Sequence, residues 1–269
     1  MSMGTAEARY HQLEQTRQSY LDRARDCSEL TIPSLIPQDN HNETSELYTP
    51  FQGIGARGVN NLASKLSLAL MPPNSPFFRF MVEPYTLKDL AQDEAARTQI
   101  EQQLGEYERA VMSEIETSGD RVAMHEALKH LIIGGNVLLQ VGPEKTRVIH
   151  LDSYVVSRAP NGEVLEIVIV ENVSPNALDK TTASAVSGKL EGDEKTVEIY
   201  THIERKANMF HVYQEVKGTV IAGSRGKYKP NAVPFLPLRF SRIDGEDYGR
   251  GFVEELLGDL RSLEGLSQA

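Results

Sequence analysis

The chain has 269 residues, a formal net charge of −10, 40% hydrophobic residues and 25% charged residues. These values describe an ordinary globular protein with enough apolar material for one large domain or two small ones. No apolar run approaches the roughly 18 residues of a membrane span, and the acidic balance argues against tight binding of duplex DNA. Cys27 is the single cysteine, which excludes an internal disulfide. Because no secretory signal is present, a reducing cytoplasm and a buried, inert thiol are expected.

The N-terminal segment predicts a long helix over residues 7–30. Tyr10, Leu21 and Ala24 recur on one side of it at helical spacing. The prolines of the segment Thr31–Pro37 end the helix, because proline cannot continue it.

The segment Gly53–Gly58 (GIGARG) carries the G-x-G-x-x-G pattern of a dinucleotide-binding turn. That pattern needs a buried strand before it, a helix after it and an acidic residue about 20 positions further on. A helix over residues 58–71 is predicted, but Pro50 interrupts the place of the strand and no acidic residue follows before Arg79. A dinucleotide-binding enzyme is therefore the least favoured alternative. The preferred interpretation is that these glycines let a helix start close to a neighbouring backbone.

Two further helices are predicted before the β-rich region begins. The first covers residues 93–117, and the second covers residues 121–133. Residues 74–82 between the glycine-led helix and this pair predict a turn and a short strand. The apolar side of the 93–117 helix, expected to face inward, consists of Leu104, Tyr107, Val111 and Ile115.

Residues 136–240 are predicted to be β-rich. Gly134-Gly135-Asn136 marks the switch from helix to strand, and Pro160-Asn161-Gly162 is a strong turn signal between two apolar runs. The turn at Lys206-Ala207-Asn208 predicts a hairpin, and Ser174 with Pro175 predicts the start of a polar helix. The segment Ala232–Phe240 contains two prolines and is expected to be at most an edge strand. Together these elements predict an α+β fold, with helices followed by a β-rich meander.

The last segment, from about Gly251, predicts a helix with an apolar stripe of Phe252, Leu256, Leu260 and Leu263 that extends to Leu266. In one interpretation Gly265 caps a short terminal helix. The favoured interpretation is an interrupted helix, so that the chain is the N-terminal part of something longer.

No catalytic, cofactor or metal site is predicted. His125 and His130 lie five residues apart, whereas two metal ligands on one helix face need a spacing of four. The carboxylates around Asp244–Asp247 and at Glu254-Glu255 are interpreted as a solvated surface, and no Walker-type phosphate loop occurs.

Four long blocks of the sequence resemble one protein family, the portal (head-to-tail connector) proteins of short-tailed, podovirus-type bacteriophages. They are residues 22–37 (DRARDCSELTIPSLIP), 50–78 (PFQGIGARGVNNLASKLSLALMPPNSPFF), 125–139 (HEALKHLIIGGNVLL) and 244–266 (DGEDYGRGFVEELLGDLRSLEGL). The blocks span nearly the whole chain in the family's order. Family members are roughly twice this length.

The resemblance implies a structural subunit and not an enzyme. Such subunits form a dodecameric ring at one capsid vertex, a conduit for DNA packaging and ejection without sequence readout. The implied partners are the major capsid, scaffolding, terminase and tail adaptor proteins, with no membrane. The implied location is the virion, and the host cytoplasm during assembly. Residues 1–243 would be wing, and residues 244–269 would approach and start the first stem helix. The rest of the stem, the clip and the crown would be absent.

Candidate site residues follow from the resemblance together with the apolar patterns, because a closed ring needs two different contact surfaces on each subunit. The candidate interface residues are Arg57, Leu62, Leu66, Leu256, Leu260 and Leu263. Glu254 and Arg261, on one side of the last helix, are candidates to face the DNA channel; the competing interpretation is an ion pair between subunits that contributes little. A monomeric acidic adaptor or scaffold-type interaction protein is the alternative function.

Overall fold

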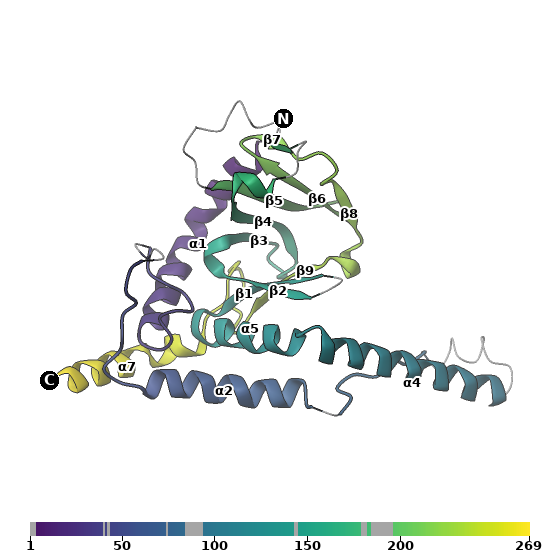
Figure 1. Ribbon diagram of the computed structural model, residues 1–269, viewed down its shortest axis with the longest axis horizontal. Helices are drawn as coiled ribbons and strands as arrows, with labels where there is room; N and C mark the ends of the chain where they lie inside the picture. The colour runs from purple at the N-terminus through teal and green to yellow at the C-terminus, as the bar shows by residue number, and fades with distance from the viewer. Residues whose placement is uncertain are drawn as a thin grey trace.

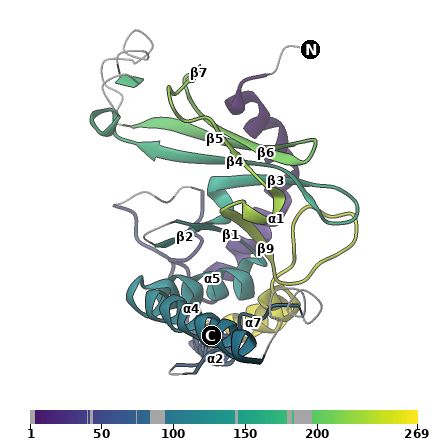
Figure 2. The ribbon, with the colours of Figure 1, turned by 90° about the vertical axis from the view of Figure 1, so that its right-hand side faces the viewer.

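The computed structural model describes residues 4–39, 41, 44–73, 75–83, 94–142, 145–178, 182–183 and 196–269. The molecule is layered. A six-stranded sheet lies above a three-stranded sheet, helix α5 lies below the small sheet, and α2 and α7 lie below α5 (Figures 1 and 2). Helix α1 runs alongside these layers. The predicted α+β class is confirmed.

The helices agree closely with the sequence prediction except at one start. They are α1 (Ala6–Glu29), α2 (Ile54–Leu70), α4 (Glu94–Thr117), α5 (Asp120–Gly134) and α7 (Phe252–Gln268). The predicted start of α2 at residue 58 is wrong, since the helix begins four residues earlier and contains Gly55 and Gly58. Helix α7 passes through Gly265, so this glycine is not a cap.

The strands form two antiparallel sheets. In the small sheet the order is β2 (Thr146–Ile149), β1 (Asn136–Val141) and β9 (Phe235–Arg239), so the proline-containing β9 is an edge strand as predicted. The large sheet contains β3 (Tyr154–Arg158), β4 (Val164–Val173), β5 (Val197–Lys206), β6 (Met209–Val216) and β7 (Thr219–Val220), with β8 (Gly226–Tyr228) paired to β6. The described part of the chain also contains the short 3₁₀ helices η1 (Leu151–Ser153), η2 (Pro175–Ala177) and η3 (Pro230–Ala232).

Local signals set the connections between these elements. Gly135 has φ of 73° and sits between α5 and β1, where the sequence predicts the switch. Lys206 pairs with Met209 across the predicted hairpin turn, in which Ala207 has φ of 53°. After Ser174 the structure has a 3₁₀ turn at η2, and residues 182–183 are helical; residues 179–181 and 184–195 lie outside the described residues.

The large sheet is covered on both faces. Val155, Val168 and Tyr200 point to one face, where Tyr10 of α1 packs on them. Ile167 and other residues at alternate positions point to the opposite face and join the main core. The alternation is the usual period of a strand buried on two sides. Cys27 belongs to the main core, where 1% of it is exposed.

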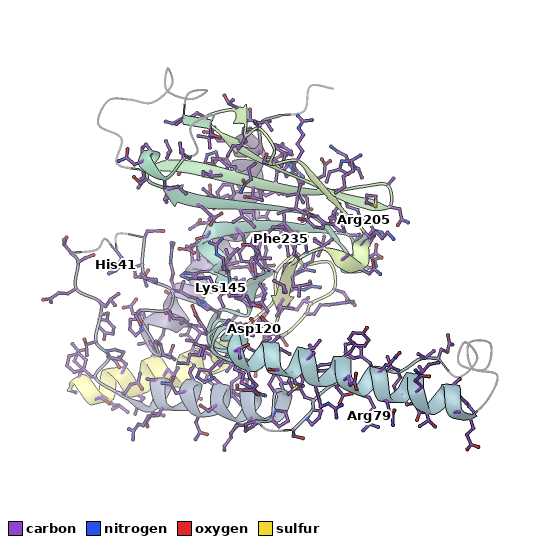
Figure 3. All side chains as sticks on the ribbon, turned by 45° about the vertical axis from the view of Figure 1, so that its right-hand side comes forward. His41, Arg79, Asp120, Lys145, Arg205 and Phe235 are labelled. Carbon is purple, nitrogen blue, oxygen red and sulfur yellow. The ribbon has the colours of Figure 1, made fainter. Side chains whose placement is uncertain are left out.

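Helix α4 differs from the prediction because it extends away from the sheets (Figure 1). None of its 24 residues is buried, and Tyr107 is 66% exposed, so the expectation that Leu104, Tyr107, Val111 and Ile115 face inward is wrong. The predicted strand within residues 74–82 is also wrong for the described residues 75–82, which pair with no sheet. This segment, with Arg79, runs along the flank of α4 (Figure 3).

Among the described helices, none is both long enough and apolar enough to cross a membrane.

Candidate subunit interface

The start of α2 is held against the end of α1 by Gln52. The Gln52 side chain donates from Nε2 to the Leu30 carbonyl at 2.7 Å and accepts from the Gly55 backbone N–H at 2.9 Å. A Cβ atom on Gly55 would lie only 2.4 Å from the Leu30 carbonyl oxygen. The preferred interpretation of the glycines is therefore confirmed at Gly55. The dinucleotide alternative loses its basis, because the described residues 44–53 contain no strand.

The start of α7 is held against the end of α5 in a similar way. The Asn136 side chain donates to the Gly249 carbonyl at 2.9 Å and accepts from the Gly249 N–H at 2.7 Å. A Cβ atom on Gly251 would lie 2.3 Å from the Ile133 carbonyl oxygen. These close approaches fix where α7 begins.

Glu264 joins α7 to the segment that leads into α2. Its carboxylate accepts from the Tyr48 hydroxyl at 2.5 Å, from the Phe51 N–H at 2.9 Å and from the Gln52 N–H at 3.3 Å. The hydrogen bond from Tyr48, followed by those from the backbone, lowers the pKa of Glu264 below its ordinary value. The side chain therefore stays ionised and links the two helices at neutral pH.

An apolar groove of about 350 Å³ runs between α2 and α7. Ile54, Phe252 and Leu256 stand at its rim and are 57%, 38% and 41% exposed. We call this surface the α2/α7 groove. Its lining residues are Thr31, Ile54, Gly55, Gly58, Val59, Asn61, Leu62, Lys65, Ile132, Phe252, Val253, Leu256 and Leu260.

The structure brings three of the six candidate interface residues into this groove, namely Leu62, Leu256 and Leu260. Leu66 packs beside the main core, and Leu263 is half-buried. Arg57 is exposed and donates from Nε to the Gly53 carbonyl at 3.2 Å. Their role in contacts between subunits stays a prediction.

The two candidate channel residues both turn toward α1 of the same chain. Glu254 accepts from Arg250 at 2.9 Å and lies 3.3 Å from Arg23, whereas Arg261 donates to Asp26 at 2.8 Å. Hydrogen bonds from Arg250 to Glu246 and then to Glu254 raise the Arg250 pKa. The predicted common side of α7 is therefore observed, and its charges are paired within the chain. A role toward DNA stays a prediction.

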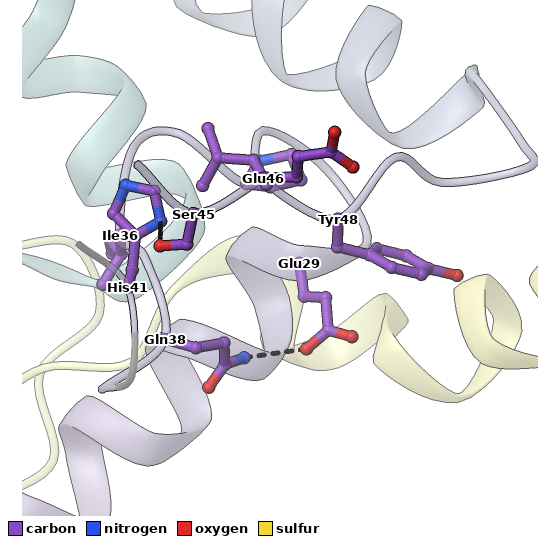
Figure 4. A pocket seen from close by; sticks show the side chains of 9 residues that line it. Glu29, Ile36, Gln38, His41, Ser45, Glu46 and Tyr48 are labelled. Carbon is purple, nitrogen blue, oxygen red and sulfur yellow. Dashed lines mark hydrogen bonds between the residues drawn. The ribbon is translucent and has the colours of Figure 1, made fainter. Parts of the chain in front are cut away.

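A smaller pocket lies between the end of α1 and residues 41 and 45–48 (Figure 4). It has a volume of about 180 Å³. Gln38 donates to Glu29 at 2.7 Å, and Ser45 lies 3.2 Å from His41 Nδ1. These polar contacts lie on the wall of the pocket.

The described residues thus form an α+β fold with an apolar groove between two of its helices, as in a structural protein that packs against other chains. A family model for bacteriophage head to tail connecting proteins matches residues 3–269, and the chain belongs to this family. It is 41% identical to the portal protein of Escherichia phage T7 over 276 aligned residues, which cover 98% of this chain and 51% of that protein. It is also 41% identical to the portal protein of Enterobacteria phage T3 and 31% identical to that of Enterobacteria phage SP6. The chain spans about half the length of these curated relatives.

Gln52, Asn136 and Glu264 position the groove. The sequence pattern predicts a turn at Asn136 but no such contact for any of the three. Glu264 had a detectable signal. It follows Leu260 by four residues and therefore lies on the buried side of α7, together with Val253 and Leu260. A carboxylate on a buried helix face indicates a specific partner.

Proposed function

We propose that this chain forms the wing and the start of the stem of a ring-shaped phage portal subunit. The observation that carries the proposal is the head-to-tail connector match, which extends over residues 3–269. In this proposal residues 1–243 are wing and residues 244–269 lead into the stem. The ring is a dodecamer at the capsid vertex of the virion, it assembles in the host cytoplasm, and it has no enzymatic activity.

The proposed ring is a passage for double-stranded DNA and an attachment point for capsid, scaffolding, terminase and tail proteins. A net charge of −10 per chain, repeated around a ring, supports movement of DNA without tight binding, because phosphates are repelled.

Two uncovered apolar surfaces support ring closure. One is the α2/α7 groove. The other lies along α4, where Tyr107 is 66% exposed, and on the adjoining segment, where Met81 lies near Leu104 and is 80% exposed. The two surfaces lie in different parts of the molecule and differ in shape. Head-to-tail closure of a ring requires such unlike surfaces on each subunit.

The test is native mass spectrometry of the purified chain, together with two-dimensional averages from electron microscopy. The expected particle has twelve times the 29.9 kDa mass of the chain and a central hole. Leu256→Glu should abolish the ring, because it places a charge in the α2/α7 groove. Leu165→Glu on β4 is the matched control, since Leu165 is 40% exposed and Leu256 is 41% exposed.

A wild-type chain that stays monomeric at all protein concentrations would contradict this proposal and favour the monomeric adaptor. If both variants lose the ring equally, the groove is not the contact. Circular dichroism of the variants would separate loss of assembly from loss of folding.

A further inference from the structure

Three potential metal ligands come together between α5 and the small sheet. Glu126 and His130 lie four residues apart on α5, and His150 follows strand β2. One ligand atom from each residue lies within 4.8 Å of the others. Helix α5 lies directly below β1 and β2 (Figure 2), so the cluster bridges the helical layer and the small sheet.

His130 is the buried member of this cluster. It is 1% exposed, and its ring stacks on that of His150 with a centroid distance of 5.0 Å and an interplanar angle of 25°. Its Nδ1 atom is buried and has no hydrogen-bond partner among the described residues. A buried polar atom without a partner is costly and calls for an explanation.

The unpartnered Nδ1 atom of His130 suits a metal ligand. Neutral histidine binds metals through the lone pair of a ring nitrogen, and a ligand of this kind would give the buried atom the partner that it lacks among the described residues.

The other two ligands are accessible. The side chain of His150 is 44% exposed, and Glu126 is exposed. An ion could therefore enter from solvent, contact the two outer groups first and then reach His130. Asp152 Oδ1 lies 3.9 Å from His150 Nδ1, close enough for a small rotation to let it orient that imidazole.

We propose that Glu126, His130 and His150 bind one divalent transition-metal ion of the Zn²⁺ class. Two imidazoles and one carboxylate form a known three-ligand zinc set and leave a fourth position for water, whereas Mg²⁺ and Ca²⁺ prefer oxygen ligands. The ion would tie α5 to the loop after β2. This proposal is independent of ring assembly.

The geometry sets a clear requirement. Donors at 2.0–2.1 Å from one tetrahedral zinc ion are separated by about 3.3 Å. Atoms as far apart as 4.8 Å must therefore close by roughly 1.5 Å. Rotation of the exposed Glu126 and His150 side chains can supply this movement, while the buried His130 stays in place.

His125, which shares α5 with His130, does not belong to this cluster. The relevant helical pair is Glu126 with His130, which has the required spacing of four. Only the fold shows that His150 joins them.

The test uses the chain purified with a chelator and then titrated with Co²⁺, whose visible d–d bands report four-coordinate binding. We expect one Co²⁺ per chain, displaced by Zn²⁺. We also expect Zn²⁺ at 100 times its Kd to raise the Tm by roughly 5 °C. His150→Gln should abolish the bands, and Glu126→Gln should weaken binding at least 10-fold.

His125→Gln is the matched control on the same helix, and it should bind Co²⁺ like the wild type. The test avoids substituting His130, because loss of this buried side chain would also affect folding. Absence of one-to-one Co²⁺ binding by the wild type would overturn the proposal, leaving the stacked histidines as packing only. Unchanged bands in His150→Gln would overturn it as well, because the ion would then lie elsewhere.

Discussion

Gly55→Ala should destabilise the protein, although alanine normally favours a helix. The added Cβ would lie 2.4 Å from the Leu30 carbonyl oxygen, so α2 must move away from the end of α1. Overpacking of this kind costs roughly 1–3 kcal/mol. The movement also strains the hydrogen bond from Gln52 to Leu30, worth about 1 kcal/mol, whereas the gain in helix propensity is about 0.5–1 kcal/mol. The net loss in the free energy of unfolding is about 2 kcal/mol, or roughly 4–8 °C in Tm.

Gly58→Ala is the matched control in the same helix, since nothing lies within 4 Å of its Cβ position. This variant should be more stable than the wild type by about 0.5–1 kcal/mol. Urea unfolding followed by circular dichroism measures both, at a protein concentration where all three proteins have the same assembly state. Gly55→Ala with wild-type stability, or equal losses in both variants, would refute the close approach of α2 to Leu30.

Two predictions concern buried titratable groups. Burial raises the pKa of Glu166, but hydrogen bonds from His202 and Arg9 outweigh this effect and bring the pKa to about 2. Glu166→Gln should therefore lower the free energy of unfolding by roughly 2–3 kcal/mol at pH 7. A carboxylate with a lowered pKa stabilises the fold at pH values above its unfolded pKa. As the pH falls from about 5 to about 2, the urea midpoint of the wild type should therefore fall more steeply than that of the variant. Parallel curves would argue against the contacts of Glu166 with His202 and Arg9. Burial also raises the pKa of Cys27 to about 12, so a thiol-specific chromogenic reagent at pH 8 should label it only after unfolding. Rapid labelling of the folded chain would contradict its place in the core.

Much of the fold could be predicted because its signals are local. The switch from α5 to β1 depends on Gly135, which adopts a positive φ that other residues resist. The β5–β6 hairpin follows from a short turn between alternating strands. The buried side of α1 follows from its helical spacing, which places Tyr10, Leu21 and Ala24 on the core. Such features need no knowledge of distant residues.

The incorrect predictions concern features that depend on contacts between residues far apart in the sequence. The start of α2 shifts to Ile54 because Gln52 and Leu30 fix it, and Glu264 completes that site from more than 200 residues away. A helix pattern identifies an apolar face but does not say which element will cover it. The same limit explains the incorrect strand at residues 75–82, because β-forming residues make a strand only where a sheet edge is available to pair with them.

Helix α4 shows why an incorrect prediction of burial can still carry information about assembly. Its pattern places Leu104, Tyr107, Val111 and Ile115 on one side, as in a helix that packs on a core. Among the described residues, the segment near Arg79 lies beside Leu104, and no residue of α4 is buried. Tyr107 is 66% exposed and Val111 is 39% exposed. Exposed apolar side chains that cluster on one surface are typical of a contact with another polypeptide. If the α2/α7 groove of one subunit is one contact surface of the proposed ring, α4 is positioned to provide the unlike surface that head-to-tail closure requires.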